Sequence, residues 1–468
     1  MVYIEKTKEE SVMSSKINRI LVLVFGATTG VTLNEFVVGK GFRLLWSREI
    51  PWVMDGKVYL WPITWLCDLL TEVKAMARPG DIITLAMWGA DVVHIADGGL
   101  VGKVIHYRSV PGDFAEKMIV DSGVSEYELS RLMGNVHAAS YQAVFQDAFW
   151  RLYTGNRNRL QAIPMADWMT YKLTGQKGHD QSMLHNQGQG VETSARVNQL
   201  FDSKNLTEFA PWNRCKWSYN GLVALPCTYN AYVVPCTHDS PLARLVLAST
   251  GLKAGVWTGS WYGVNFVIKE GDNIIPSERT HKANLVFEAM PGGGVSAISN
   301  IGMHGPLWKA LKNARGEISY AQAAEMAMPH INWAFVDKAI FTDEIMGLDP
   351  VKFVERVMRI FGISNPNALG LTLAALANTI AVSSRNGLAD AAKALGIPCP
   401  TDIAIVGGFA ENRVILEALR LHGLNVTIPP FAGLATQAGA AAQALFLAGK
   451  AKSIKEALGM LPDKVLTE

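Results

Sequence analysis

The sequence has few cysteines, no strong charge of either sign and no long apolar run. Its five cysteines in 468 residues include no Cys-x-x-Cys pair, which excludes a disulfide framework and a zinc knuckle and favours a reducing, cytoplasmic location. A net charge of +2 without a Lys/Arg run argues against nucleic acid or an anionic membrane as a partner. No uncharged stretch reaches the roughly 18 residues of a membrane span, and the charged residues 1–17 do not resemble a signal peptide.

What the sequence does contain is enough apolar material for a large folded enzyme. Hydrophobic residues make up 49% of the chain and charged residues 18%, a balance typical of well-packed globular proteins. The length predicts two domains of roughly 200 to 250 residues, because single hydrophobic cores stop growing near that size. We expect a polar tail over 1–17, a first domain over 18–247 and a second domain over 248–468.

The first half of the chain opens with a strand, a small turn and a second strand. Apolar residues 17–25 lead into the glycine- and threonine-rich turn 26–30, and residues 31–38 follow as the return strand. Further on, the periodicity predicts a helix over 61–76, strands over 81–87 and 92–96, and helical structure over 139–175. A loop over 176–193, a short strand over 231–235 and a helix from 241 follow.

The second half repeats this order. A hairpin is predicted over 255–268 with its turn at Thr258-Gly259-Ser260. Helical patterns then cover 320–328, 351–361 and 371–394, and a strand over 402–406 leads through a glycine pair into a helix over 412–422. Two halves that each begin with a strand, a small turn and a strand predict a duplicated α/β fold.

The two small-residue turns are candidate phosphate-binding sites. Glycine lets a backbone approach a phosphate closely, and backbone N–H and hydroxyl groups donate to its oxygens. The turns at Gly26 to Gly30 and at Thr258 to Ser260 have this composition. An ordinary structural turn has the same composition, so the residues alone leave both interpretations open.

Asp239 is the candidate catalytic carboxylate. It follows a predicted strand and precedes a predicted helix, within Thr237-His238-Asp239-Ser240. A carboxylate at such a point can accept a proton from a hydroxyl group. It can equally cap the helix that follows, so a catalytic and a capping role both stay open.

Taken in order, six segments resemble those of the FGGY carbohydrate kinases, nearest to the rhamnulokinase-like branch. They span most of residues 18–447, and they are Gly26-Ala27-Thr28-Thr29-Gly30; Met87-Trp88-Gly89-Ala90-Asp91 with Asp97-Gly98-Gly99 and His106-Tyr107-Arg108; Thr237-His238-Asp239-Ser240; Thr258-Gly259-Ser260-Trp261; Val406-Gly407-Gly408-Phe409-Ala410-Glu411-Asn412; and Gly433-Leu434-Ala435-Thr436 with Gly439.

The resemblance implies a ribonuclease-H-like, actin-type ATPase fold of two duplicated domains with a central cleft, using ATP and Mg²⁺. It implies that Asp239 is the catalytic base and that the sugar is bound by Trp88, Gly89, Asp91 and His238. It implies an ATP site formed by Gly26, Thr28, Thr29, Thr258, Gly259, Ser260, Gly407, Gly408 and Asn412. No protein metal ligand is predicted.

The sequence departs from the family at three places. The family's first loop usually begins with an aspartate two residues before the first glycine, where this chain has Val24. In the family, that aspartate is associated with magnesium. Three alternatives follow for this chain: another carboxylate replaces the aspartate, the nucleotide and water hold the metal, or catalysis is weak or lost. Val31 stands where rhamnulokinase-like chains tend to carry arginine, and 409–411 replace a usual glycine, serine and glutamine.

Other candidate residues also have two interpretations. Trp88 either stacks on a sugar face or packs in the core, and Asp91 either binds hydroxyls or holds a turn. The polar patch with His179, Asp180 and His185 either lines the sugar pocket or, less in keeping with its spacing, binds a metal.

The sequence thus predicts transfer of the γ-phosphoryl group of ATP to a hydroxyl of a small ketose such as L-rhamnulose or L-fuculose, by a monomer or homodimer. The alternative is a non-catalytic sugar or nucleotide sensor on the same fold. Val24 suggests this alternative, because it stands in place of the family's usual aspartate. An actin-like or chaperone-type ATPase is a third hypothesis, but it does not explain why the chain carries the segments around Trp88 and Asp239.

Overall fold

The structure is a computed structural model that describes most of the chain. It covers residues 17, 19–26, 30–133, 142–187, 207–209, 222–226, 228, 230–259, 262–268, 277–291, 294–302, 308–309, 312, 318–332, 355–356, 359, 369–461 and 466.

The chain divides into two compact units. Unit 1 consists of Met1–Leu245, Val286–Val295 and Thr436–Glu468, and unit 2 of Val246–Leu285 and Ser296–Ala435. The sequence analysis placed one boundary near residue 247. In the structure the chain passes from unit 1 to unit 2 between Leu245 and Val246, and two later segments return to unit 1.

Unit 1 is built on a six-stranded sheet in the order β11-β12-β6-β1-β2-β3. The predicted hairpin is present, since β1 and β2 pair antiparallel and Gly26 faces Gly30, while β6 runs parallel to both β1 and β12. The strands are β1 (Arg19–Gly26), β2 (Gly30–Val37), β3 (Gly41–Arg48), β6 (Asp81–Met87), β11 (Val223–Ala224) and β12 (Tyr232–His238). A separate pair, β4 (Val53–Asp55) and β5 (Val58–Leu60), follows β3.

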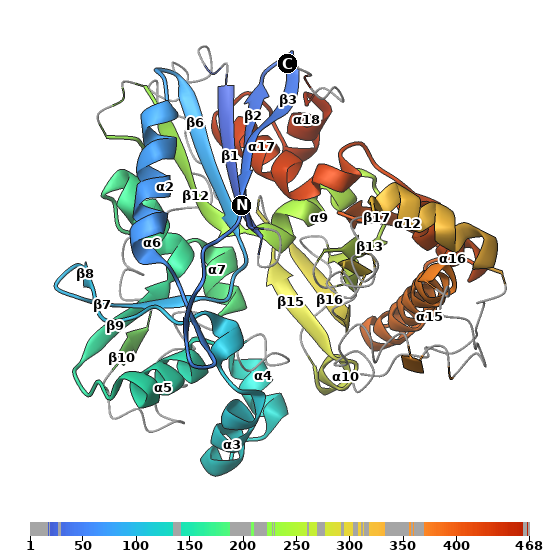
Figure 1. Ribbon diagram of the computed structural model, residues 1–468, viewed down its shortest axis with the longest axis horizontal. Coiled ribbons are helices and arrows are strands. Elements are labelled where there is room, and N and C mark those ends of the chain that lie inside the picture. Colours follow the sequence, from blue (N-terminus) through green and yellow to red (C-terminus); the bar gives the residue numbers. More distant parts are fainter. Residues whose placement is uncertain are drawn as a thin grey trace. The chain divides into compact units, whose positions relative to one another are not determined.

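Both faces of the central strands are buried because helices cover both. Residues Leu21, Leu23 and Phe25 of β1 share one apolar cluster with α2 (Ile63–Met76) and α6 (Met165–Thr174). The intervening residues Ile20 and Val22 are also fully buried. Figure 1 shows α2 and α6 on one side of these strands and α17 (Ala435–Leu447) on the other. The continuous apolar runs that predicted β1 and β6 follow from this two-sided burial.

A second, four-stranded sheet of unit 1 has the order β10-β9-β7-β8. Its strands are β7 (Val92–Ala96), β8 (Gly99–Leu100), β9 (Leu160–Pro164) and β10 (Thr207–Phe209), and the helices near it in the chain are η1 (Tyr107–Ser109), α3 (Gly112–Ser122), α4 (Glu126–Met133) and α5 (Ala143–Thr154). The prediction of helical structure over 139–175 was wrong at β9. The five residues of β9 pair with β7, where Val93 faces Ile163, and such a distant pairing leaves no mark on local periodicity.

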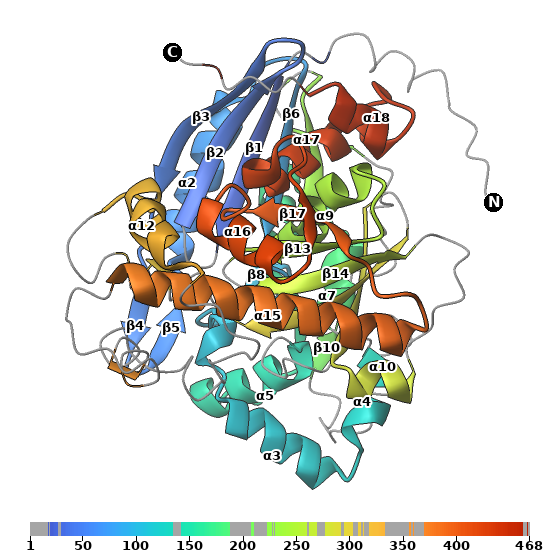
Figure 2. The same ribbon diagram turned by 90° about the vertical axis from the view of Figure 1, so that its right-hand side faces the viewer.

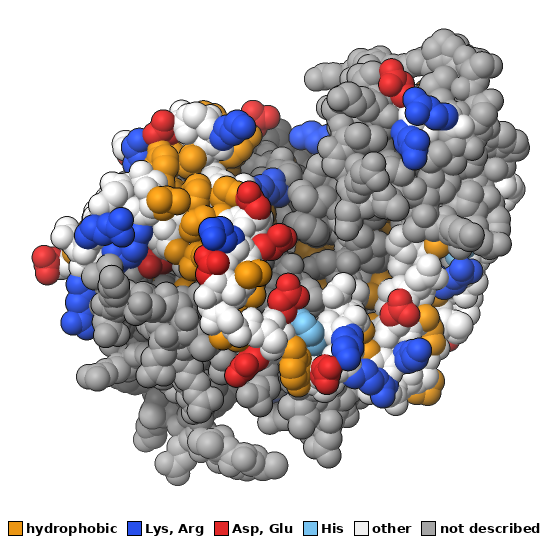
Figure 3. Space-filling view, turned by 90° about the horizontal axis from the view of Figure 1, so that it is seen from below, with side chains coloured by type: hydrophobic (Ala, Val, Ile, Leu, Met, Phe, Trp, Pro, Cys, Tyr) orange, Lys and Arg blue, Asp and Glu red, His pale blue; other side chains and the backbone are white. Residues whose placement is uncertain are grey.

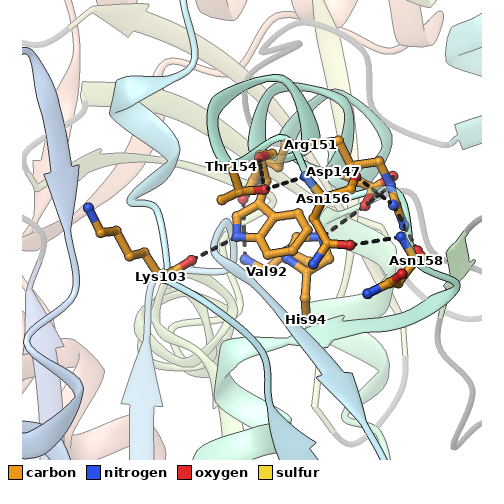
Figure 4. Close-up of polar contacts among 10 residues, drawn as sticks. Val92, His94, Lys103, Asp147, Arg151, Thr154, Asn156 and Asn158 are labelled. Carbon is orange, nitrogen blue, oxygen red and sulfur yellow. Dashed lines mark hydrogen bonds and ion pairs between the residues drawn. The ribbon is translucent and has the colours of Figure 1, made fainter.

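A buried polar network joins β7 to α5 (Figure 4). The His94 ring stacks on Trp150 at 4.0 Å, and its Nε2 lies 2.9 Å from Asp147 Oδ1. Arg151 Nε donates to the same carboxylate, and Arg151 Nη1 donates to the backbone oxygen of Asn158 at 3.0 Å. Burial lowers the pKa of His94. The network thus fixes the turn that carries the chain from α5 into β9.

Unit 2 contains the second predicted hairpin. β13 (Ala254–Thr258) pairs antiparallel with β14 (Tyr262–Ile268) and parallel with β17 (Asp402–Gly407), in a sheet whose order includes β16-β14-β13-β17-β18. The other elements are α10 (Glu278–Lys282), β16 (Val295–Gly302), α12 (Tyr320–Ala327), η3 (Met328–His330), α15 (Leu369–Leu395), α16 (Arg413–Leu421), β18 (Asn425–Thr427) and η4 (Ala432–Leu434). In Figure 2 the long helix α15 lies lengthwise, with α12 and α16 beside it. The helix expected over 351–361 falls largely outside the described residues.

A short helix, α7 (Gln181–Asn186), replaces part of the predicted loop 176–193. Asp180 caps it, because its Oδ1 accepts from the backbone N–H of Ser182 at 3.0 Å and from the Ser182 hydroxyl. Asp167 of α6 accepts from the backbone N–H of Asp180 at 3.0 Å and lies 2.6 Å from His179 Nδ1. Burial, with Asp167 nearby, raises the pKa of Asp180 to about 7.

The described surface mixes both signs of charge. Lys, Arg, Asp and Glu side chains are interspersed on the face in Figure 3, with apolar side chains gathered between them. Within the described residues, no helix is long and apolar enough to cross a membrane.

Gly439 sets how closely α17 approaches α9 (Asp239–Ser249). A Cβ at this position would lie 2.0 Å from the Leu242 carbonyl oxygen. We therefore expect Gly439→Ala to lower the free energy of unfolding by about 1–3 kcal/mol, the usual cost of overpacking. Chemical denaturation measures this. Gly459→Ala in α18 (Ile454–Gly459) is the control, because nothing lies within 4 Å of its added Cβ, and an equal loss in both variants would contradict the close approach.

The capping carboxylate makes stability depend on pH. The Asp180 pKa is about 7 in the folded state against an ordinary value of 3.8, so the folded state holds the proton more tightly. The free energy of unfolding should fall as pH rises between these values, by up to about 1.4 kcal/mol per pH unit.

Asp180→Asn keeps an oxygen for α7 but has no proton to lose. Its stability relative to the wild type should therefore rise between about pH 4 and about pH 7 and then level off. Denaturant titrations across this range measure the difference, with Asp121→Asn at an exposed position of α3 as control. Parallel curves for the wild type and Asp180→Asn would contradict the assignment.

Candidate active site

The parallel pairing of β6 with β12 brings two of the predicted segments together. His238, the last residue of β12, is the register partner of Met87, the last residue of β6. Trp88 and Asp239 are the next residues of their chains, so both leave the sheet at the same edge. In α/β sheets ligands bind beyond the carboxyl ends of such strands. This edge is therefore the candidate site of unit 1.

Asp91 organises the aromatic side of this edge. One carboxylate oxygen accepts from the backbone N–H of Tyr107 at 2.7 Å. The other accepts from the indole N–H groups of Trp61 at 2.7 Å and Trp88 at 2.9 Å. Asp91 is 1% exposed, and these contacts are all internal to the protein. Asp91 therefore fixes the orientation of the Trp61 and Trp88 rings.

Trp88 belongs to a cluster of rings at the end of β6. It stacks on Trp61 with centroids 5.3 Å apart and meets His106 edge-on at 5.5 Å. Only 7% of Trp88 is exposed, so it packs mainly against protein. Gly89 is required by the same packing, because a Cβ there would lie 2.3 Å from the Asn186 amide nitrogen.

Asp239 is the first residue of α9, and a quarter of its side chain is exposed. Its Oδ1 accepts from the Ser240 hydroxyl at 3.3 Å and lies 3.4 Å from His238 Nε2. Burial raises the pKa of Asp239, and the nearby Glu288 acts in the same direction, while His238 opposes both. A partly exposed carboxylate with a raised pKa is suited to accept a proton.

The segment before Asp239 is held from two sides. The backbone N–H of His238 donates to the Ser182 hydroxyl at 3.1 Å. The Thr237 hydroxyl lies within 3.5 Å of Asp180 Oδ2. The pairing of β12 with β6 shifts register between Val234 and Thr237, and Pro235 within that shift has no N–H to lose. The cap of α7 and this irregularity together position His238 and Asp239.

The nucleotide residues predicted in unit 2 also come together. Thr258 is the register partner of Gly407, and its hydroxyl donates to the Val406 carbonyl at 2.9 Å and accepts from the backbone N–H of Phe409. Gly407 has φ +107°, and a Cβ on it would lie 2.4 Å from the Thr258 carbonyl oxygen. Gly408 is exposed with open space around it. The backbone of this turn is thus accessible at Gly408.

The other predicted nucleotide residues differ in what the structure describes. Asn412 caps α16, its side-chain oxygen accepting from the backbone N–H of Val414 at 3.1 Å. Gly259 lies against the ring of Trp257. Gly26 is described at the end of β1, whereas Thr28, Thr29 and Ser260 lie outside the described residues.

Three residues of the unit 1 site were missed by the sequence analysis as site residues: Asp167, Arg244 and Glu288. Arg244 and Glu288 are in contact, and both are buried. A signal existed, because each is the lone charge within an apolar run, in Pro-Leu-Ala-Arg-Leu-Val-Leu and in Leu-Val-Phe-Glu-Ala. Buried charges are almost always paired, but the sequence does not say with which partner.

The described residues offer little to a protein-bound metal. Val24 is 9% exposed and its register partners in the sheet are Thr32 and Ala86, none of which carries a charge. In the part of the chain that the structure covers, no group of three or more His, Cys, Asp or Glu could hold an ion.

Comparison with known proteins gives a fold. No protein-family model matches the chain, and no curated protein matches its sequence. Solved structures do match.

A Plasmodium falciparum glycerol kinase with ADP aligns over 95% of this chain and 92% of its own, with TM-score 0.68 and 13% identity. A ligand-bound xylulose kinase from Lactobacillus acidophilus aligns over 95% and 92%, with TM-score 0.65 and 10% identity. A carbohydrate kinase from Novosphingobium aromaticivorans aligns over 92% and 91%, with TM-score 0.61 and 15% identity. The chain therefore has the mixed α/β fold of these sugar kinases, with sheets in both units, which is the actin-like ATPase fold that the sequence predicted.

Proposed function

We propose that the protein is an ATP-dependent kinase that phosphorylates a hydroxyl group of a small carbohydrate. The observation that carries the proposal is the placement of Asp239 beside the Met87-Trp88 segment, at the carboxyl edge of the unit 1 sheet. The fold shared with glycerol, xylulose and carbohydrate kinases supports it. Fold alone does not fix function, so the proposal depends on this carboxylate.

In the proposed reaction Asp239 is the general base. The acceptor hydroxyl gives its proton to the Asp239 carboxylate while its oxygen forms a bond to the γ-phosphorus of ATP. The bond between that phosphorus and the β–γ bridging oxygen breaks, and ADP leaves with the electron pair. His238 lies 3.4 Å from the carboxylate, where it opposes the rise that burial causes in the pKa of Asp239.

The turn at Thr258, Gly259, Gly407 and Gly408 fits a nucleotide. Its backbone is accessible at Gly408, and the Thr258 hydroxyl bridges its two strands. Val24 and its uncharged neighbours do not fit a magnesium ligand. We therefore infer that magnesium comes with the nucleotide, which with water supplies its oxygen ligands, and no residue of the described chain is assigned to it.

The acceptor is proposed to be a small ketose or polyol. Trp88 presents only a small exposed area, so at most one apolar face of a small sugar would contact it. The likeness to the rhamnulokinase-like branch favours an L-rhamnulose- or L-fuculose-like ketose. Solved structures that share the fold are named as a glycerol kinase, a xylulose kinase and a gluconate kinase, so glycerol, xylulose and gluconate belong in any test.

A catalytically impaired sugar or nucleotide sensor is the second candidate. Val24 favours it, because the apolar side chain stands where related chains usually carry an acid. A sensor would bind ATP or a sugar without releasing ADP.

The deciding test is ADP release by the purified protein with Mg-ATP across ketoses, aldoses, polyols and sugar acids. We expect release that depends on one class of acceptor, with ketoses strongest. ATP binding by calorimetry without release for any acceptor would support the sensor. Release that needs no acceptor would point to an ATPase.

Replacement of the base gives the sharper prediction. Asp239→Asn keeps the size of the side chain but cannot take a proton, so turnover should fall by roughly 100- to 10,000-fold.

The wild-type enzyme should also show a pH dependence that reports the same carboxylate. Its activity should be lost as pH falls through the raised pKa of Asp239, above the ordinary value of 3.8. Initial rates across pH measure both effects, with Asp68→Asn on the exposed face of α2 as control. Unchanged turnover in Asp239→Asn would remove this residue from the mechanism.

A further inference from the structure

A chain of ionisable groups leads from Asp239 into the interior of unit 1. His238 Nε2 lies 3.4 Å from Asp239 Oδ1, and on its other side His238 Nδ1 lies 3.8 Å from Glu288 Oε2. The same Glu288 oxygen contacts Arg244 Nη2. Three elements supply these groups, since His238 ends β12, Arg244 lies in α9, and Glu288 lies in β15 (Leu285–Ala289).

Arg244 and Glu288 depend on each other. The Arg244 side chain is 1% exposed and the Glu288 side chain 10% exposed. Within the described residues, Nε and Nη1 of Arg244 have no hydrogen-bond partner. Glu288 is therefore the counter-ion that offsets the cost of this buried guanidinium. Replacing a buried ion pair by apolar residues of similar size often costs little stability. Stability alone therefore does not explain why this pair lies beside His238.

We propose that Arg244 and Glu288 are positioning residues of the active site, in which the guanidinium fixes the Glu288 carboxylate and this carboxylate holds His238 against Asp239. The inference depends on the proposed kinase function for its catalytic part. Its electrostatic part concerns only the four residues and can be measured without turnover.

Other titratable groups also face this region. Around β12 they are Cys236 in the strand itself, Asp167 on α6 and Asp180 before α7, all buried. Asp167 is paired with His179, and Asp180 is the cap of α7. In the described contacts neither aspartate is paired with His238. Among the described groups, Glu288 is the carboxylate that faces His238 from the side opposite Asp239.

The two members of the pair should act on Asp239 in opposite directions. Glu288 contributes to the raised pKa of Asp239 because like charges repel. Removing the Glu288 charge leaves Arg244 unbalanced, so the pKa of Asp239 should fall. Removing the Arg244 charge takes away a positive charge that attracts the Asp239 carboxylate, so the pKa of Asp239 should rise. A pair without electrostatic coupling to Asp239 would not produce opposite shifts.

The experiment compares Glu288→Gln, Arg244→Met and the charge-balanced Arg244→Met/Glu288→Met with the wild type. The ¹³Cγ signal of Asp239, identified by its absence in Asp239→Asn, is titrated by NMR in aspartate-labelled protein. The midpoint should move to lower pH in Glu288→Gln, to higher pH in Arg244→Met, and lie between them in the double variant. The acidic limb of kcat/KM for ADP release should move in the same directions, and kcat should fall roughly 10- to 100-fold as the base loses its position.

Glu278→Gln is the matched control, because it breaks an exposed carboxylate–lysine pair with Lys282, and it should shift neither readout. Coincident Asp239 midpoints in the wild type and Glu288→Gln would overturn the proposal, as would shifts of the same sign in both single variants. Glu288→Gln is nearly isosteric and keeps the test decisive if Arg244→Met does not fold. Opposite NMR shifts without any ADP release would support the positioning pair and reject the kinase.

Discussion

The parallel alignment of β6 with β12 is the constraint on which the unit 1 site depends. Two strands separated by more than a hundred residues end at the same level because Met87 pairs with His238. Their next residues, Trp88 and Asp239, then leave the sheet together. Parallel strands need long crossover connections, and this crossover contains the second sheet, α5, α6 and α7. The register of one strand pair therefore decides whether a ring and a carboxylate from distant segments become neighbours.

The same edge concentrates buried acids. Asp91, Asp167, Asp180 and Glu288 are all nearly inaccessible, and each is held by a different kind of partner. Asp91 accepts from two indoles, Asp180 caps a helix, and Glu288 is paired with a guanidinium. Asp239 alone of this group keeps a quarter of its side chain exposed. A carboxylate that is partly accessible among satisfied ones is the member best placed to exchange a proton with a ligand.

Much of the fold followed from local patterns in the sequence. The strands over 81–87 and 92–96 were predicted to the residue, and both strand–turn–strand units were found. These elements are short apolar runs bounded by glycine or charge, so their signal is local. β9 and α7 were missed because one depends on pairing with β7 and the other on a cap by Asp180. The roles of Arg244 and Glu288 depend on a contact between residues 44 positions apart, which no local pattern reports.

The three-part composition of unit 1 has a consequence for how the chain folds during synthesis. Its last part, Thr436–Glu468, includes nearly all of α17, whose Gly439 lies against α9. Helix α17 covers one face of the central strands (Figure 1), yet the ribosome makes it after all of unit 2. The N-terminal sheet must therefore wait, with an apolar face incompletely covered, until nearly the whole chain has emerged. Domains made early usually fold first, whereas here the first unit to be started is the last to be completed, and exposed apolar sheet surface in that interval is a natural substrate for chaperones.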